Sequence, residues 1–557
     1  MQKSPHFSIG LCLLVILLSS GCVESISPPT FTEEPTITFN PNPQAPLAGI
    51  VRFKANKPVT TAIRVKDGEW ERELIYDESH NPEDGLPVIG LVPDKTHELR
   101  IFIHDSFGRL TESANKLEFH TLALPSDPTA IPPIQLTVST DSLREEGIWL
   151  VNPRRRRAGD TAFGQDFGLL LGLNIKGKVV WYYRTDSRIS DFQRLENGNI
   201  IYLTQDYRVV EIDWLGNVQS EWYATGRPDG PANGIPIETM AIHHEIDELP
   251  NGNLVVLGVE KRSIDNYYTS ETDAEAPRKT QEVMGDQIIE FQRDGTVVWQ
   301  WNAFDHLDPS RIGYNTFDEY WWSRGFPNTV DWTHGNGLMY DEQEDAYLVS
   351  LRYQDAVLSI DRASSEINWI LGEPTSWPEN LQDRLFELQG DGSWFYQQHG
   401  PVPTASGNML IYDNGNFGAR PFTPAKPNAE LYSRAVEYEI DPANGTARQV
   451  WISEEANEDA VLSLAMGDID WLPEKNNVLV TYGMLGPNDS TSVNWTRIRE
   501  YSHSQPADLL AEIVFRDTSA VDPVGWTIFG TELVPQIIPC NYCYAYPGPP
   551  RPRRRPF

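Results

Sequence analysis

The sequence contains little cysteine: four residues in 557, at positions 12, 22, 540 and 543. Cys540 and Cys543 lie close together, but a zinc site needs two further ligands near them and the sequence offers none there. In an oxidising compartment this pair can instead form a small disulfide. The cysteines therefore predict no metal site.

Positive charge is also scarce. The chain has 45 Lys and Arg residues against 79 Asp and Glu residues, which gives a net charge of −34. Binding to a phosphate backbone needs a basic surface, so this composition argues against nucleic acid as a partner. An acidic exterior instead favours solubility and has no bearing on the fold.

Long hydrophobic runs are missing as well. The N-terminal apolar run Leu11–Leu18 is short for a membrane-spanning helix. It follows Lys3 and precedes Ser-Ser-Gly-Cys at residues 19–22, a pattern typical of a lipoprotein signal cleaved before Cys22. We predict that residues 1–22 are such a signal and that the protein is exported, periplasmic or membrane-anchored through lipidated Cys22. A short membrane anchor is one alternative. Ordinary secretion is the other, because Ser19 stands where an aliphatic residue is usual.

Helical periodicity is absent over nearly all of the later chain, which predicts an all-β fold. Residues 23–46 hold many Pro, Thr and Asn residues and are predicted to be a tether. In residues 47–122, short alternating stretches such as Glu98–Ile103 are separated by Pro, Gly and Asp turns, which predicts a small N-terminal β-sandwich.

Residues 125–535 repeat one pattern of strands and turns. A first strand ends in a turn such as Asn197-Gly198 or Asn251-Gly252, an apolar second strand follows, and an outer strand ends in tryptophan, as at Trp299. The same ending recurs at Trp181, Trp222, Trp369 and Trp451, and more faintly at Phe515. Four-stranded units of this kind predict a β-propeller. We expect a six-bladed catalytic domain, with one blade completed by strands from both ends, and a disordered Pro/Arg-rich tail at residues 547–557.

Three of the 11 histidines fall at equivalent places in this repeat. His244 and His399 each stand eight residues before the glycine of a Gly-Asn turn, and His334 lies a similar distance before the turn-like stretch Asp341–Asp345. Because the first strand of each propeller blade lines the central channel, we expect the three imidazoles to face that channel. A lone histidine on a strand is usually structural, but three at aligned positions favour a functional cluster.

Arg352 and Asn336 are predicted to join the histidines. Alternation along the inner strand places His334 and Asn336 on one face, and Arg352 ends the next strand. Arg offers a planar fork of donors that matches sulfate or phosphate oxygens, and an imidazole can attack an electrophile or transfer a proton. Proximity to Arg352 favours the neutral, nucleophilic imidazole. The cluster therefore indicates group transfer on an anion.

Other features receive structural interpretations. A metal held by the histidines is the alternative to group transfer, but Arg352 would repel a cation. His243 is expected to point away from His244, and Arg154–Arg157 is expected to be a solvated basic loop. Trp321, Trp322 and Trp332 lie near His334 and could stack on an aromatic substrate.

These residues resemble the bacterial arylsulfate sulfotransferases over about residues 47–534. The motifs that carry the resemblance are His243-His244-Glu245, residues 331–336 (Asp-Trp-Thr-His-Gly-Asn), Ser350-Leu351-Arg352, Gln398-His399, and residues 412–415 (Tyr-Asp-Asn-Gly). The family usually has His-His-Asp at the first of these motifs.

The resemblance implies a secreted, six-bladed propeller with an N-terminal β-sandwich. It also implies transfer of a sulfuryl group from a phenolic sulfate ester to another phenol by a ping-pong route, with no cofactor and no nucleotide sulfate donor. In this interpretation His399 is the nucleophile and forms a sulfohistidine. The residues that stabilise the sulfuryl oxygens are His244, His334, Asn336 and Arg352. One of these two histidines also assists proton transfer.

Three alternatives remain open from the sequence. A sulfate-ester hydrolase would share the histidines and use water as acceptor. A surface-anchored propeller could bind an aromatic or sulfated ligand without turnover. A quinone-dependent dehydrogenase would need a calcium site and a carboxylate base in the channel, and the sequence offers no such cluster.

Overall fold

The computed structural model describes residues 27–68, 71–157, 164, 166–454, 459–486 and 493–535. The predicted signal peptide with Cys22, the pair Cys540 and Cys543, and the tail at residues 547–557 lie outside the described residues. Within the described ranges, no helix combines the length and the apolar character needed to span a membrane.

The described part of the chain is nearly all β-structure. It contains one short α-helix and four 3-10 helices: α1 (Ala303–His306), η1 (Trp322–Arg324), η2 (Arg352–Gln354), η3 (Glu379–Arg384) and η4 (Asn428–Glu430). The prediction of an all-β fold is therefore confirmed.

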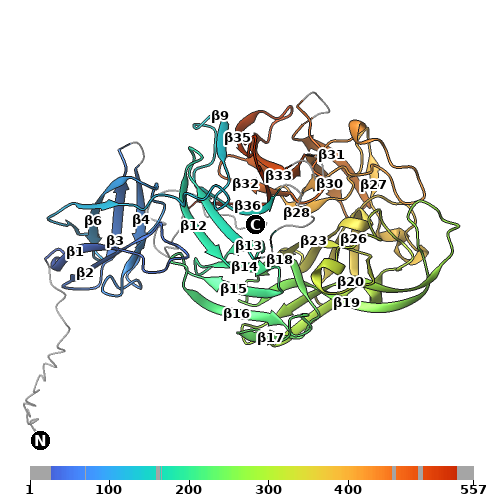
Figure 1. Cartoon of the computed structure of the whole chain (residues 1–557), viewed down its shortest axis with the longest axis horizontal. Coiled ribbons are helices and arrows are strands. Elements are labelled where there is room, and N and C mark those ends of the chain that lie inside the picture. Colours follow the sequence, from blue (N-terminus) through green and yellow to red (C-terminus); the bar gives the residue numbers. More distant parts are fainter. Residues whose placement is uncertain are drawn as a thin grey trace, which may run out of the picture.

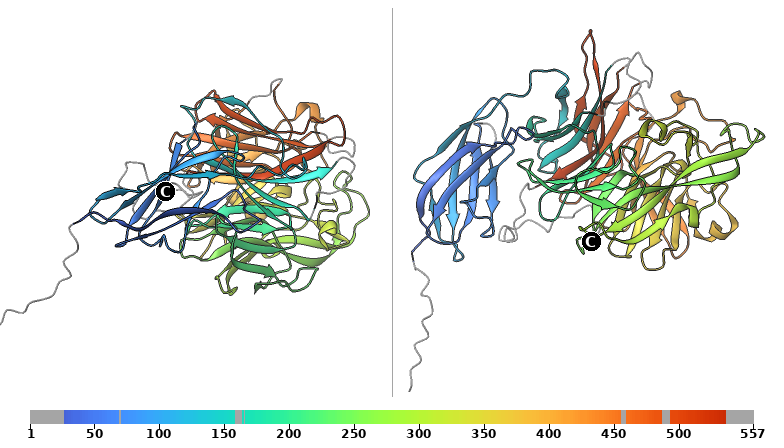
Figure 2. Two further views of the ribbon diagram at one scale, coloured as in Figure 1. Left: turned by 60° about the vertical axis from the view of Figure 1, so that its left-hand side comes forward. Right: turned by 60° about the horizontal axis from the view of Figure 1, so that its bottom comes forward.

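Two sheets form an N-terminal lobe beside the rest of the molecule (Figures 1 and 2). One sheet has the order β1-β2-β5, with β1 (Phe31–Phe39), β2 (Gly49–Ala55) and β5 (Leu86–Val88). The other has the order β4-β3-β6-β7, with β8 also paired to β6: β3 (Thr60–Lys66), β4 (Glu71–Tyr76), β6 (Thr96–His104), β7 (Leu110–Glu112) and β8 (Leu117–His120). Burial alternates along β6, as a half-buried strand requires.

The predicted tether at residues 23–46 is wrong in its middle part. Residues Phe31–Phe39 form β1, which pairs antiparallel with β2. The alternating, Thr-rich sequence of β1 suits a strand at the edge of a sheet. Pro35 is compatible with this position, because proline is tolerated on edge strands. Further along, Asn40 donates from its side chain to the carbonyl oxygen of Leu215 at 2.8 Å, so this segment fastens the lobe to the rest of the protein.

The remaining chain is arranged as six sheets of the described residues around one centre (Figure 1). From the centre outward, the first sheet consists of β36 (Val524–Val534), β10 (Ile148–Arg157), β11 (Gly168–Leu173) and β12 (Val179–Thr185). The second consists of β13 (Ile189–Arg194), β14 (Ile200–Thr204), β15 (Arg208–Ile212), β16 (Val218–Ala224) and β17 (Ile235–Ile237). The third consists of β18 (Ile242–Glu248), β19 (Leu254–Tyr267), β20 (Lys279–Phe291) and β21 (Val297–Asn302), with β22 (Thr329–Asp331) paired to β20.

The other three sheets follow the same order from the centre outward. The fourth sheet consists of β23 (Gly335–Asp341), β24 (Ala346–Leu351), β25 (Ala356–Asp361) and β26 (Ile367–Gly372). The fifth consists of β28 (His399–Pro403), β29 (Met409–Asp413), β30 (Arg434–Asp441), β31 (Thr446–Ile452) and β27 (Glu387–Gln389). The sixth consists of β32 (Asp468–Leu472), β33 (Asn477–Leu485), β34 (Trp495–Ser502), β35 (Leu509–Phe515) and β9 (Ile134–Ser139).

The innermost strands contact one another in a closed ring, in the order β13, β18, β23, β28, β32, β36 and back to β13. Two sheets close the ring by pairing strands from opposite ends of the chain: β36 pairs with β10, and β35 pairs with β9. The sequence predicted one such sheet. Sharing two sheets ties both ends of the chain into the ring by backbone hydrogen bonds.

In the sequence pattern, each repeat ends in an aromatic residue. All six of these residues lie on the fourth strand of their sheet, counted from the centre. They are Trp181 on β12, Trp222 on β16, Trp299 on β21, Trp369 on β26, Trp451 on β31 and Phe515 on β35. Trp181 and Trp222 are fully buried. These aromatic rings supply much of the apolar packing between sheets.

The ring has two distinct ends. We call the end where the innermost strands begin the pocket end, because His244, His334 and His399 lie there. The innermost strands finish at the turn end, in turns such as Asn251-Gly252, where Gly252 adopts a φ of 81° that favours glycine.

Candidate active site

A cavity of about 410 Å³ opens at the pocket end. Its walls come from β10, β13, β18, β36 and the loops around β23 and β28. Four of the five predicted site residues line it: His244, His334, His399 and Arg352. The structure therefore brings together, from three different sheets, side chains that lie between 18 (His334 to Arg352) and 155 residues (His244 to His399) apart in sequence.

His399 begins β28 and is buried. Its Nδ1 lies 2.6 Å from Oδ1 of Asn414. The Asn414 amide nitrogen donates to the carbonyl oxygens of Ser463 and Met466, both at 3.0 Å, which identifies Oδ1 as the acceptor. Nδ1 of His399 must therefore carry the hydrogen, so Nε2 keeps its lone pair. Burial and the nearby Arg352 lower the pKa of His399 well below its usual value, which favours this neutral form.

His334 directly precedes β23 and has a φ of 50°. Its Nδ1 lies 2.5 Å from Oδ2 of Asp331, and its ring stacks on Tyr353 at 4.6 Å. Burial lowers the pKa of His334, whereas burial and the neighbouring Asp286 raise the pKa of Asp331 to about 7. These shifts favour a neutral imidazole beside a carboxyl that titrates near neutral pH.

Asn336 does not line the cavity, and the prediction that it shares a face with His334 is wrong. The left-handed backbone at His334 and a register shift between Gly335 and Gly337 break the alternation on which that prediction relied. The Asn336 amide donates to the carbonyl oxygen of Gln398 at 2.8 Å and accepts from the Ser350 hydroxyl at 2.8 Å. Asn336 therefore fixes the backbone next to His399.

His243 and His244 form a contacting pair, contrary to the prediction that they point apart. Their Nδ1 atoms lie 2.7 Å apart, and Nε2 of His243 lies 3.0 Å from Oδ1 of Asp286. A register shift after His243 and a φ of 58° at His244 turn both rings toward the cavity. Asp286 is held by Thr333 and by the backbone N–H of Gly335 at 2.6 Å.

The pair extends to a tyrosine that sequence reasoning missed. Nε2 of His244 lies 3.4 Å from the Tyr320 hydroxyl, and the Tyr320 ring lies 4.5 Å from the ring of His334. A series of polar contacts therefore runs from Asp286 through His243 and His244 to Tyr320. Burial and the neighbouring His243 lower the pKa of His244, and the Asp286 carboxylate lies on the far side of His243.

Arg352 begins η2 and is held by its backbone. Its N–H donates to the carbonyl oxygen of His334 at 3.1 Å, and its Nη2 donates to the carbonyl oxygen of Leu464 at 3.0 Å. Its buried Nε has no hydrogen-bond partner in the described residues. Arg352 lines the cavity, and a guanidinium beside imidazoles is suited to bind an anion.

Two further arginines line the cavity, and sequence reasoning placed neither of them there. Arg154 was predicted in a solvated loop, but it lies on β10, is only 8% exposed, and donates to the carbonyl oxygen of Ile189 at 3.2 Å. Arg324 lies 3.6 Å from the centroid of the Tyr320 ring. The four consecutive arginines form a strand because β10 pairs with β36 over its whole length.

The tryptophans proposed to contact an aromatic substrate do not line the cavity. Trp332 is fully buried and donates to the carbonyl oxygen of Arg311, and Trp322 donates to the carbonyl oxygen of Thr329. Trp321 packs edge-on against His243 at 5.2 Å. The aromatic rings that do line the cavity are Tyr207, Tyr320, Phe417 and Phe529.

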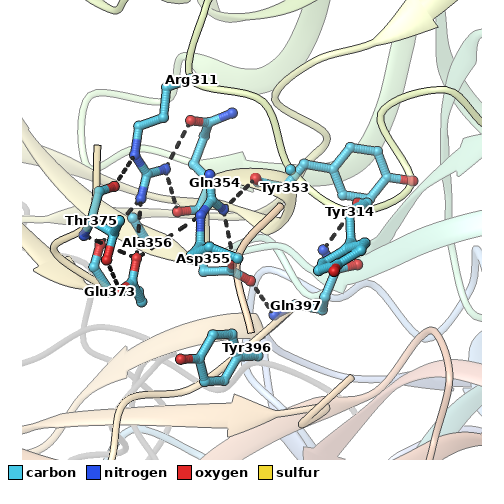
Figure 3. Close-up of polar contacts among 12 residues, drawn as sticks. Arg311, Tyr314, Tyr353, Gln354, Asp355, Ala356, Glu373, Thr375, Tyr396 and Gln397 are labelled. Carbon is cyan, nitrogen blue, oxygen red and sulfur yellow. Dashed lines mark hydrogen bonds and ion pairs between the residues drawn. The ribbon is translucent and has the colours of Figure 1, made fainter. Parts of the chain in front are cut away.

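A buried polar network supports the wall that carries Arg352 and His399 (Figure 3). Asp355 accepts from the backbone N–H of Gln397 at 2.8 Å and from Arg420 at 2.6 Å. Arg311 donates to the carbonyl oxygens of Gln354 at 2.7 Å and Glu373 at 3.1 Å. The network ties the segment after Arg352 to the segment before His399, which fixes their separation.

No group of three or more His, Cys, Asp and Glu side chains in the described part of the chain is arranged to hold a metal ion.

Comparison with known proteins identifies related sequences. The family model for arylsulfotransferase (ASST) matches residues 137–520. A curated relative from Escherichia coli O6:H1, named arylsulfate sulfotransferase AssT, is 27% identical over 252 residues, covering 37% of this chain and 39% of the relative. A protein of the same name from Lelliottia amnigena is 29% identical over 283 residues, covering 43% of each chain. The chain thus matches about two fifths of the length of these relatives.

Solved structures give weaker likenesses. A protein of unknown function from Bacteroides caccae has a TM-score of 0.33 and 11% identity, with 64% of this chain and 90% of that chain covered. BamB from Moraxella catarrhalis has a TM-score of 0.27 and 9% identity, with 77% and 95% covered. Scores this low decide nothing about function.

Proposed function

Because the chain belongs to the arylsulfotransferase family, we propose that it moves a sulfuryl group from a phenolic sulfate ester to another phenol by a ping-pong route through a sulfohistidine, without a nucleotide sulfate donor. The observation that carries this proposal is the state of His399. Its Nδ1–H is fixed on Asn414, its Nε2 lone pair is available, and the guanidinium of Arg352 belongs to a residue that lines the same cavity.

In the first half-reaction, Nε2 of His399 attacks the sulfur of the donor. An N–S bond forms, the S–O bond to the phenol breaks, and the leaving phenolate takes the electron pair. Arg352 and His334 are the donors suited to the sulfuryl oxygens, and each well-placed donor supplies on the order of 3 kcal/mol. The Asn414 carbonyl accepts the Nδ1–H and stabilises the positive charge on the sulfonated ring.

In the second half-reaction, the hydroxyl oxygen of the acceptor phenol attacks the same sulfur. The N–S bond breaks and its electron pair returns to Nε2. The phenolic proton passes to the His243–His244 pair, which the Asp286 carboxylate stabilises in its protonated state. The next leaving phenolate receives this proton, so protons balance over one complete cycle.

The test is release of 4-nitrophenol from 4-nitrophenyl sulfate by purified protein lacking residues 1–22, with no nucleotide present. We expect release that depends on added phenol and disappears in His399→Asn. Detection of sulfonated His399 by mass spectrometry, after mixing with donor alone, would identify the intermediate directly. Release without phenol would instead identify a sulfate-ester hydrolase, and saturable binding without release would identify a ligand-binding propeller.

We also propose that the ring of sheets is a six-bladed propeller and that the two N-terminal sheets form a β-sandwich. The ring contacts among β13, β18, β23, β28, β32 and β36 support the first assignment. A single core shared by residues of both N-terminal sheets, such as Val51 and Ile101, supports the second.

Export with a lipid on Cys22 is proposed from the sequence of residues 1–22 alone. Metabolic labelling with a fatty acid tests it: label incorporated by the full chain and absent from Cys22→Ser supports the anchor. Secretion into the medium or periplasm without label contradicts it.

A further inference from the structure

The cavity gathers more positive charge than the transfer of one sulfuryl group requires. Arg154, Arg324 and Arg352 all line it, in a protein whose net charge is −34. None of the three forms an ion pair with a carboxylate of the described residues. Arg154 and Arg352 are buried and Arg324 is half-buried, whereas most other buried arginines of that part of the chain do form such pairs, for example Arg144 with Glu500. A buried unpaired cation is costly unless an anion completes it.

The three arginines fall into two groups. Arg352 lies beside the histidines, because its backbone N–H donates to the carbonyl oxygen of His334 at 3.1 Å. Arg154 and Arg324 lie on a different wall, formed by β10 and by the insertion that carries η1. The two walls therefore present two cationic positions to one cavity.

One aromatic ring lies between each arginine of the second cationic position, Arg154 and Arg324, and a histidine of the cavity. The Arg154 guanidinium lies 5.2 Å from the Phe529 ring, which lies 6.0 Å from the His399 ring. The Arg324 guanidinium lies 3.6 Å from the Tyr320 ring, which lies 4.5 Å from the His334 ring. A substrate ring aligned beside Phe529 and Tyr320 would span this separation between its two para substituents.

Arg154 is built to stay in place. It is 8% exposed, and it is oriented by the carbonyl oxygens of Ile189 and Ser190, which occupy Nε and Nη2. Its Nη1 has only the sulfur of Met466, at 3.9 Å. The one carboxylate that lines the cavity, Asp318, accepts from the Tyr353 hydroxyl and the backbone N–H of Tyr320, and forms no ion pair with Arg154 or Arg324.

From this geometry we infer a second anion subsite, formed by Arg154 and Arg324, so that the pocket takes aryl sulfates that carry a further anionic group, such as a carboxylate, across the ring from the sulfate. This inference rests on the proposed sulfuryl transfer. It names the substrate class of that site: phenolic acids and their sulfate esters.

Two donors that differ only in charge test the subsite: 4-carboxyphenyl sulfate and its methyl ester. The ester is the more electron-withdrawing ring and so has the better leaving group. A preference for the acid therefore cannot come from leaving-group reactivity. We expect kcat/KM for the acid to exceed that for the ester by about 10-fold or more, because a charge pair inside a pocket strengthens binding.

Arg154→Gln and Arg324→Gln are each expected to lower the acid-to-ester ratio of kcat/KM by about 10-fold. Arg448→Gln removes one exposed charge from β31 and serves as the control, with both donors unchanged. If Arg154→Gln fails to fold, Arg324→Gln alone decides the question. Equal use of acid and ester by the wild-type protein overturns the subsite.

A binding measurement separates this inference from the proposed function. Calorimetric titration of His399→Asn with 4-carboxyphenyl sulfate and with its methyl ester reports charge recognition without turnover. Tighter binding of the acid that is lost on adding Arg324→Gln supports the subsite even if the wild-type protein shows no transfer. Equal affinities, with transfer intact, leave the sulfotransferase in place and remove the subsite.

Discussion

The buried polar groups at the two ends of the ring differ in how completely they are hydrogen-bonded. At the turn end, four sheets carry a glutamate at the same place, on the third strand, next to a register shift: Glu211, Glu290, Glu437 and Glu500. Each glutamate accepts from an asparagine at the turn between the first two strands of its own sheet: Asn199, Asn253, Asn408 and Asn477. Each also meets an arginine or histidine side chain from elsewhere in the ring: Arg293, Arg362, His503 and Arg144.

Glu290 shows how completely the turn end satisfies such a group. It is fully buried and accepts from Arg362 at 2.8 and 2.9 Å, from Asn253 at 2.6 Å and from Tyr347 at 2.9 Å. Arg362 belongs to the turn before β26, so the contact joins two adjacent sheets. A repeated, fully bonded charge of this kind stabilises the ring without offering any reactive group.

The pocket end repeats histidine in the same way but leaves it incompletely satisfied. His244 and His334 adopt φ values of 58° and 50°, and Nε of Arg352 has no partner in the described residues. Left-handed backbone at non-glycine residues is costly and persists where surrounding contacts fix it, which is common at functional sites. One repeat therefore supplies stability at one end of the ring and histidines that line a cavity at the other.

Removal of the unsatisfied charge should have the largest effect. We expect Arg352→Gln to lower kcat/KM by about 10²-fold to 10³-fold, because a donor to the sulfuryl oxygens is lost. Arg352 also depresses the pKa of His399. Nε2 is reactive only above that pKa, so the acid limb of the pH–rate profile should move to higher pH in the variant.

The control for this variant is stability. Because Arg352 has no carboxylate partner among the described residues, we expect its thermal midpoint to stay close to that of the wild-type protein. A steep loss of stability together with an unshifted acid limb would falsify the role given to Arg352.

Disruption of the turn end should act on stability alone. Glu290→Ala removes the buried partner of Arg362, which keeps its contact with the more exposed Asp345 at 3.6 Å, and is expected to cost about 3 kcal/mol of unfolding free energy, as breaking a buried ion pair does. Denaturant titration measures this loss, and kcat/KM of the folded protein should stay within about two-fold. Ser359 holds the equivalent place on β25, and Ser359→Ala, the matched control, should cost less than about 1 kcal/mol.

The proton path offers a smaller, more specific effect. Asp286→Asn keeps the shape of the side chain and removes the charge that stabilises a protonated His243. We expect about a 10-fold to 100-fold loss for donors with a basic leaving phenol, because these need a proton on departure. 4-Nitrophenyl sulfate, whose leaving group needs less assistance, is the internal control. An equal loss for both donors would show that Asp286 acts only by positioning.

Glu145 is the exception at the turn end and gives the smallest predicted effect. Burial raises its pKa to about 7 from an ordinary 4.5, and its Oε2 has no partner in the described residues. The folded protein keeps a proton that the unfolded chain releases, so stability falls as pH rises from about 4.5 to 7. Glu145→Gln should remove this fall and add on the order of 1–2 kcal/mol at pH 8. Unfolding curves at pH 5 and pH 8 measure the difference, and identical pH dependence in both proteins contradicts it.

Local pattern predicted the strands well, because alternation, turn residues and the terminal tryptophan all act within one repeat. Trp299 and Trp369 fall on equivalent strands for that reason. The same local reasoning failed at Asn336 and Arg154. Asn336 was misplaced by a backbone turn at His334, and Arg154 was misplaced because its partner strand, β36, lies about 370 residues later in the chain.

The sequence by itself determined the all-β repeat, the acidic composition and the alignment of His244, His334 and His399, since each follows from residue type and spacing. Only the tertiary structure decided which polar groups meet. It paired His243 with Asp286, turned Asn336 into the wall, and brought Arg154 and Arg324 to the cavity. The physical reason is closure of the ring. Contacts between sheets depend on which strands become neighbours and on single backbone angles, and neither is encoded in a local pattern.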